Sequence, residues 1–207
     1  MKKFLSLLLF VLSSAVVAVA QTAPEIISRM ETEMQANEKN GIIMTMDTKI
    51  PILGTMTVKA YALDKKMRME ADMLGVRVIT WMDSETEWVY NSKTNTVEIK
   101  NVDPSKKDEN DNSEMFENIT EGYDVSIDKE TADAWYILCK KSRTNKDKDA
   151  PKTMDLVVSK GSFYPISLTA KVSGITLTLR DISFGVSESQ VTFDAKNCPG
   201  ATIEDKR

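Results

Sequence analysis

An alternation of apolar and polar residues constrains the fold of this chain more than any other sequence feature. It runs through three successive segments, near residues 42–47, 56–60 and 67–73. Successive side chains of a strand point to opposite faces of a sheet, so a period of two is typical of strands that bury one face. The apolar phase contains Ile42, Met44, Met46, Met56, Val58, Ala60, Met67, Met69, Ala71 and Met73. The pattern predicts three consecutive half-buried strands.

Further segments extend this predicted sheet, and turn residues such as Asp83 and Ser84 separate them. They cover residues 76–82, 87–91, 96–100, 132–140, 154–159, 166–172, 175–182 and 190–193. Before the first strand, residues 24–37 are predicted to form a helix with an apolar side made of Ile26, Ile27, Met30 and Met34. We therefore predict a mainly β (α+β) fold. Its single antiparallel sheet must curl, because open twisted sheets rarely exceed about ten strands, and the N-terminal helix is available to cover it.

Two polar segments interrupt the strands. Residues 103–113 contain Lys, Asp, Glu and Asn, which predicts a mobile surface loop, and a short helical segment is predicted over residues 114–119. A second loop, residues 141–152, is rich in Lys. No repeat and no shift in composition marks a second domain, so residues 21–207 are expected to form one domain.

The N-terminus has the pattern of an export signal. Lys2 and Lys3 precede an apolar stretch over residues 4–12, and Ala18-Val19-Ala20 is a small-x-small cleavage site. Residues 1–20 are therefore predicted to be a cleaved secretory signal peptide. An uncleaved membrane anchor is the alternative, because the apolar segment is close to the minimum length of a membrane span.

The composition excludes several kinds of chemistry. The chain has no His, so a Ser-His-Asp triad, a Cys-His dyad and a His-ligated metal site cannot be built from it. Its carboxylates fall on the polar phase of the strands or in loops, where nothing raises their pKa towards catalytic use. With 27 Lys and Arg against 31 Asp and Glu, the net charge of -4 also disfavours a nucleic-acid partner. We expect no enzymatic activity, no cofactor and no metal site.

Cys139 and Cys198 are the two cysteines of the chain. In an oxidising compartment a disulfide can persist, and closing so long a loop would stabilise the fold by roughly 4 kcal/mol in the chain-entropy model. We favour a possible disulfide between these two residues. Two separate, half-buried thiols are the alternative.

Methionine is enriched on the predicted buried face, since six of the 12 methionines lie on the apolar phase of the first three strands. Met is not a favoured strand residue, and its flexible side chain adapts to varied neighbours. Such a face suits variable apolar ligands, although a plain core filled with Met would give the same pattern.

Several short motifs make the chain similar to the family of periplasmic outer-membrane lipoprotein carriers (LolA-like proteins). The run Lys65-Lys66-Met67-Arg68-Met69-Glu70 resembles the family's Arg/Lys-x-Arg-x-Glu strand, and Trp88-Val89-Tyr90-Asn91 resembles its Trp-x-Tyr-Asn segment. Towards the end of the chain, Val191-Thr192-Phe193-Asp194 and Pro199-Gly200-Ala201-Thr202-Ile203-Glu204-Asp205 resemble its closing motifs, Phe-x-Phe, Pro-x-Gly-Val and Asp-x-Arg. The resemblance covers essentially the whole of residues 21–207.

This resemblance implies an unclosed, strongly curved antiparallel β-barrel of about eleven strands, with the N-terminal helix and a short helical lid over its concave face. It implies a soluble, monomeric periplasmic carrier that hides the acyl chains of lipoproteins in an apolar cavity. An inner-membrane ABC transporter would supply the lipoprotein, and an outer-membrane acceptor would receive it. A half-barrel sensor of envelope stress, or a module for a different lipid, is the alternative.

The acyl-chain site is expected along the concave face. Its predicted residues are Ile42, Met44, Met46, Met56, Val58, Met67, Met69, Met73 and Trp88. The chain departs from the family at the gate of the cavity, where Ala60-Tyr61 stands in place of an Arg-Pro pair. No gating residue is therefore carried over.

Overall fold

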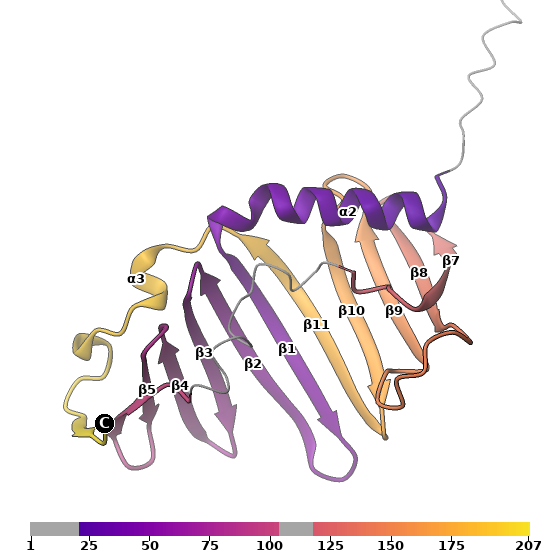
Figure 1. Cartoon of the computed structure of the whole chain (residues 1–207). Coiled ribbons are helices and arrows are strands. Elements are labelled where there is room, and N and C mark those ends of the chain that lie inside the picture. Colours follow the sequence, from indigo (N-terminus) through magenta and orange to yellow (C-terminus); the bar gives the residue numbers. More distant parts are fainter. Residues whose placement is uncertain (1–20, 104–117) are drawn as a thin grey trace, which may run out of the picture.

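A computed structural model of the chain describes residues 21–103 and 118–207. Twelve strands form one sheet in the order β12-β6-β5-β4-β3-β2-β1-β11-β10-β9-β8-β7, which is curled but not closed (Figure 1). The strands are β1 (Ile42–Ile50), β2 (Gly54–Leu63), β3 (Lys66–Met73), β4 (Val76–Met82), β5 (Thr86–Asn91), β6 (Thr96–Asn101), β7 (Tyr123–Glu130), β8 (Ala134–Lys141), β9 (Thr153–Ser159), β10 (Pro165–Val172), β11 (Ile175–Phe184) and β12 (Thr202–Asp205). The predicted mainly β, unclosed sheet is confirmed.

Two antiparallel meanders make up the sheet, and the pairing of β1 with β11 joins them. One meander is β1 to β6, and the other is β7 to β11. β12 differs from the other strands because it runs parallel to its neighbour, β6, and forms the edge of the first meander. Within the described sheet, strands that are distant in sequence thus pair at two places, β1 with β11 and β6 with β12.

The predicted N-terminal helix is confirmed as α2 (Ala23–Asn37). Its start is stabilised by Glu25, whose carboxylate accepts hydrogen bonds from the backbone N–H and the hydroxyl of Thr22 at 2.8 and 2.9 Å. A short 3-10 turn, η1 (Glu38–Asn40), follows, and Gly41 then turns the chain into β1 with a φ of 66°. A Cβ at Gly41 would lie 2.6 Å from the carbonyl oxygen of Ala62, so only glycine fits there.

The largest apolar core lies between α2 and the sheet. In Figure 1, α2 runs across the strands from β7 to β1. Its buried residues Ile26, Ile27, Met30 and Met34 pack with side chains of β1, β2, β8 and β9. The strand residues of this cluster include Ile42, Met44, Ala62, Trp135, Ile137, Cys139, Met154, Leu156 and Val158. Among the described residues, no helix is both long enough and apolar enough to cross a membrane.

The C-terminal segment covers the other face of the first meander. It contains α3 (Glu188–Val191), η5 (Ala195–Asn197) and β12. Val186 and Val191 pack on Tyr61, and Phe193 and Cys198 pack with Trp81. Because Tyr61 and Trp81 share a face with Arg68 in the strand register, both clusters lie opposite to the α2 core.

One sequence prediction about an element is wrong, and two strands were missed. The predicted strand over residues 190–193 is wrong, since α3 ends at Val191 there. β7 and β12 were not predicted, although the predicted strand over residues 132–140 corresponds to β8. The polar segment after Lys141 is irregular as predicted. The predicted signal peptide (residues 1–20), and nearly all of the predicted loop and helical lid before residue 118, lie outside the described residues.

Candidate apolar binding face

The pairing register assigns each strand side chain to one face of the sheet. Met44 pairs with Ala60 and Ala60 pairs with Met69, so all three lie on the face that α2 covers, which we call the helix face. The same register places eight of the nine predicted site residues on the helix face. They are Ile42, Met44, Met46, Met56, Val58, Met67, Met69 and Met73.

These eight residues divide into a core part and a half-exposed part. Ile42 and Met44 are buried in the cluster beneath α2 and therefore act as core residues. Met46, Met56, Met67 and Met69 are half-buried, and Met73 is 50% exposed. Val58 is buried, yet neither it nor these five methionines belong to any of the three apolar clusters formed by the described residues.

Apolar side chains of β4 and β5 extend the half-exposed part. Val78 pairs with Ala71, and Val89 pairs with Thr80, which places them on the helix face. We call the whole set the apolar strip; it consists of Met46, Met56, Val58, Met67, Met69, Ala71, Met73, Val76, Val78, Met82 and Val89. The sequence assigned no β4 residue to a face, because both phases of β4 are apolar, and from β5 it assigned only Trp88. The second apolar phase, Ile79 and Trp81, is the one that the C-terminal segment covers.

Charged side chains end the apolar strip on the far side from α2. Glu98 of β6 pairs with Val89 of β5 and therefore lies on the helix face beside the strip. Its carboxylate lies 2.6 Å from Lys100 and 2.7 Å from Lys206. The hydrogen bonds from Lys100 and then Lys206 lower the pKa of Glu98 to about 2. The strip thus lies between the α2 core at β1 and an ionised, polar border at β6.

The charges of β3 and β4 point to the opposite face. Glu70 forms an ion pair with Arg68 at 2.7 Å and accepts a hydrogen bond from Arg77 at 2.5 Å. The Arg68 guanidinium also lies over the rings of Tyr61 and Trp81, at 5.4 and 5.5 Å from their centroids. Nε of Arg68 and Nε1 of Trp81 are buried there without a hydrogen-bond partner. Because the charged side chains of β3 and β4 lie on the opposite face, the helix face of these two strands carries no charge.

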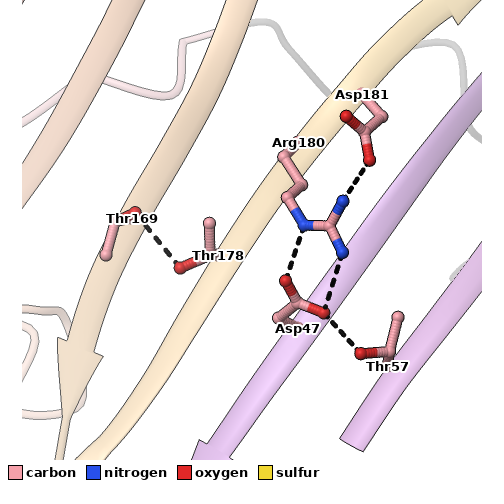
Figure 2. A network of polar contacts seen from close by, with 6 residues as sticks. All are labelled: Asp47, Thr57, Thr169, Thr178, Arg180 and Asp181. Carbon is pink, nitrogen blue, oxygen red and sulfur yellow. Dashed lines mark hydrogen bonds and ion pairs between the residues drawn. The ribbon is translucent and has the colours of Figure 1, made fainter. Parts of the chain in front are cut away.

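A second polar network on the opposite face joins the two meanders (Figure 2). Asp47 of β1 accepts a hydrogen bond from Thr57 of β2 at 2.6 Å and another from Nε of Arg180 of β11 at 2.7 Å. Arg180 also contacts Asp181, and Thr169 contacts Thr178 next to it. The hydrogen bonds from Arg180 and then Thr57 lower the pKa of Asp47. This network fixes the β1–β11 junction without placing charge on the helix face.

The prediction that Trp88 lines the apolar site is wrong. Trp88 pairs with Trp81, which pairs with Arg68, so Trp88 lies on the opposite face from Met67 and Met69. Its ring stacks on Phe193 with the centroids 5.6 Å apart and the planes 13° apart. The physical reason is the pleat: adjacent residues of a strand face opposite ways, and Val89, not Trp88, is on the helix face.

The favoured disulfide is also not present, because both cysteines are free in the structure. Cys139 of β8 is buried in the cluster beneath α2, whereas Cys198 is buried against Trp81 on the opposite face. The alternative of two separate thiols holds, and both are more deeply buried than predicted. Burial raises the pKa of Cys139 to about 11 and also raises the pKa of Cys198.

Neither a metal-binding cluster nor a polar gating pair is found at the apolar strip among the described residues. Among the described residues, no group of three or more His, Cys, Asp and Glu side chains could hold a metal ion. Ala60 and Tyr61, which stand where the resembling family has its gating pair, fall on different faces: Ala60 packs at the edge of the α2 cluster, and Tyr61 packs against Val191. Neither supplies a polar group to the apolar strip.

Comparison with known proteins gives similar structures only. No protein-family model matches the chain, and no curated protein matches it. An uncharacterised conserved protein from Thermus thermophilus is 17% identical with a TM-score of 0.47, covering 89% of this chain and 99% of that one. A LolA superfamily protein from Nitrosomonas europaea is 11% identical with a TM-score of 0.34, covering 86% of this chain and 100% of that one.

The lipoprotein LppX from Mycobacterium tuberculosis is 12% identical with a TM-score of 0.47, covering 78% of this chain and 94% of that one. Proteins named for the family that the sequence resembles are thus among the similar structures. At such low identities and TM-scores, these likenesses assign neither a site nor an activity to this chain.

Proposed function

We propose that this protein is a carrier that binds acyl chains on the apolar strip and shields them from water. One observation carries the proposal. The apolar residues of β1 to β5 on the helix face continue beyond the cluster that α2 covers and end at the charged border on β6; most of them are half-exposed, and Val58 is buried. A surface of this kind gains free energy when hydrocarbon covers it.

The side chains of the strip fit a guest of variable shape. Met46, Met56, Met67 and Met69 are long and flexible, so they can follow chains of different length and bend. Each methylene group removed from water contributes about 0.8 kcal/mol, so a long acyl chain gains enough to remain bound in an aqueous compartment. An adaptable surface also allows release, because no rigid complementary contacts have to be broken.

The finer role rests on the resemblance of the sequence motifs. We propose that the cargo is the acylated end of lipoproteins, and that the protein works in the periplasm, as a monomer, after export. An inner-membrane ABC transporter would load it, and an outer-membrane acceptor would receive the cargo. We also propose that it acts without catalysis and without a cofactor.

Substitution of one strip residue tests the proposal. Met69→Glu places a carboxylate on the helix face next to Ala60, and burying that charge against an acyl chain is costly. The affinity for a dansyl-labelled fatty acid should fall by about tenfold or more. The measurement is a fluorescence titration of the purified chain, with circular dichroism to check folding.

Tyr136→Glu is the matched control, because Tyr136 of β8 is 36% exposed and pairs with Val157 on the opposite face. It should leave the affinity for the probe unchanged. A folded Met69→Glu variant that binds the probe as tightly as the parent contradicts binding on the apolar strip. The delivery role is tested by measuring the release of lipoprotein from inner-membrane vesicles with and without the protein. If the protein does not increase this release, the delivery role is wrong, whereas acyl-chain binding is unaffected.

A further inference from the structure

Two neighbouring hairpins expose large aliphatic side chains at their tips. Between β1 and β2, Ile52 is 105% exposed and Leu53 is 80% exposed. Between β3 and β4, Leu74 is 103% exposed. The two turns lie at the same end of the sheet, because β1, β2, β3 and β4 follow one another in an antiparallel meander. In Figure 1 the β1–β2 hairpin projects at the lower end, away from α2.

Turn geometry does not require aliphatic residues at these positions. Leu74 and Gly75 have φ of 51° and 80°, and the β10–β11 turn has the same conformation with Ser173 and Gly174 at 49° and 84°. Asn, Asp and Gly are the usual residues of such turns. Other turns of this chain follow the rule, since Asp64 and Asn95 occupy positive φ.

The aliphatic residues instead carry a conformational cost. Ile52 has a φ of 71°, which is a clear outlier for a β-branched residue. Phe163 is also at positive φ, but it is buried against Trp135 and gains packing in exchange. Ile52 and Leu74 are fully exposed and gain no such packing from the part of the chain that the structure describes. Strained positions of this kind are typical of functional sites.

Exposed basic residues lie at the same end of the sheet as the tips, on β1, β10 and the β8–β9 loop. Lys49 of β1 and Lys171 of β10 are exposed and both pair with Thr176 at the start of β11. The loop over residues 142–152 joins β8 to β9 at this end and has Arg143, Lys146, Lys148 and Lys152 exposed, against Asp147 and Asp149. Asp72 of β3 is paired in the register with Arg77. This end is therefore basic in a chain whose net charge is -4.

We propose that the two hairpin tips insert Ile52, Leu53 and Leu74 into the surface of a lipid bilayer that contains anionic headgroups. Exposed aliphatic side chains with nearby cations combine hydrophobic insertion with attraction to anionic lipid. Met73 directly precedes Leu74 at the end of β3 and belongs to the apolar strip, so the membrane contact is continuous with the face that we propose for acyl chains. The proposal goes beyond acyl-chain binding, because it concerns where the protein touches the bilayer.

Sedimentation with vesicles tests this contact. The purified chain is mixed with vesicles of phosphatidylethanolamine and phosphatidylglycerol, and in parallel with vesicles of phosphatidylcholine alone. Binding should be strong only with the anionic vesicles and should weaken as salt rises. In the variant Ile52→Asn/Leu53→Ser/Leu74→Asn, partition onto the anionic vesicles should fall by roughly tenfold or more. The new Asn residues suit positive φ, so this variant should fold at least as stably as the parent.

A matched control removes an exposed aliphatic side chain at the other end of the sheet. Ile166→Asn at the start of β10, where the parent side chain is 46% exposed, should leave vesicle binding unchanged. The proposal is overturned if the parent does not bind protein-free vesicles, or if the triple variant binds them as well as the parent. Binding only to native membranes, lost after protease treatment of those membranes, would assign the tips to a protein partner instead.

A second readout separates this proposal from the proposed function. The triple variant should bind the dansyl-labelled fatty acid like the parent, because its changes lie outside the apolar strip. Loss of vesicle binding with retained probe binding supports the membrane contact. If the parent binds vesicles but not the probe, that result contradicts acyl-chain binding and leaves the membrane contact in place.

Discussion

Asp47 shows how one side chain secures the junction between the two meanders. Its carboxylate accepts hydrogen bonds from strands on both sides, from Thr57 of β2 and from Arg180 of β11. Because these bonds favour the charged form, the pKa of Asp47 in the folded protein lies below its unfolded value of about 3.9. The stabilisation is therefore fully present above that unfolded value and is lost as the pH falls through the folded pKa.

Asp47→Asn should lower the free energy of unfolding at pH 7 by about 1 kcal/mol or less, because the site is partly open to solvent. The difference from the parent should shrink as the pH falls below about 4. Urea unfolding at a series of pH values measures it. Asp181→Asn serves as the control, since Asp181 contacts the same Arg180 but is more exposed. An equal loss of stability at low and at neutral pH contradicts the assigned role of the Asp47 charge.

At the scale of elements, the sequence pattern predicted most accurately the helices and strands whose partners are close in the sequence. The helix α2 and the strands β1 to β6 follow one another with short turns, so their periodicity was sufficient. The segment at residues 190–193 was misread because its apolar and polar residues alternate. Ser187 and Gln190 were the contrary signal: the Gln190 side chain accepts a hydrogen bond from the Ser187 backbone at 2.8 Å, which begins a helical turn. β12 is short and exposed throughout, and its partner β6 is distant in sequence, so no periodicity marks it.

The C-terminal segment should contribute to stability mainly through Phe193. This ring packs edge-on against Trp81 at 5.4 Å between centroids, and it stacks on Trp88. Phe193→Ala should lower the free energy of unfolding by about 2–3 kcal/mol and shift tryptophan emission to longer wavelength. Affinity for the dansyl-labelled fatty acid should not change, because Phe193 lies opposite the apolar strip.

Ile203→Ala, which also truncates an apolar side chain of the C-terminal segment, is the control. Because Ile203 is exposed on β12, this substitution should lower the free energy of unfolding much less than Phe193→Ala does. If the two substitutions destabilise the protein equally, Phe193 is not the anchor of the segment.

At the scale of the whole molecule, the sheet has two faces with different covers. The sequence predicted eight of the nine site residues on one face, since the phase within each strand is a local property. It could not predict that Ile42 and Met44 belong to the core, because α2 and the distant strands β8 and β9 bury them. Trp88 was misplaced because the turn before β5 sets its register against β4, and no local pattern fixes that register.

The separation of the two faces determines the chemistry of the thiols. Cys139 and Cys198 are buried on opposite sides of the sheet and have raised pKa values, so both should react very slowly with iodoacetamide at neutral pH. After unfolding without a reductant, mass spectrometry should find both alkylated. A chain recovered from an oxidising compartment with the two thiols already bonded contradicts this arrangement.

The late position of the C-terminal segment in the chain also sets an order of assembly. Trp81 and Trp88 are synthesised well before Val191, Phe193 and Cys198, which cover their side of the sheet. When a polypeptide leaves the ribosome or a translocation channel N-terminus first, these two indole rings stay exposed to solvent until the C-terminal segment has emerged and packed on them. That interval is when the nascent protein is most open to aggregation, and it is when a holding chaperone protects it most.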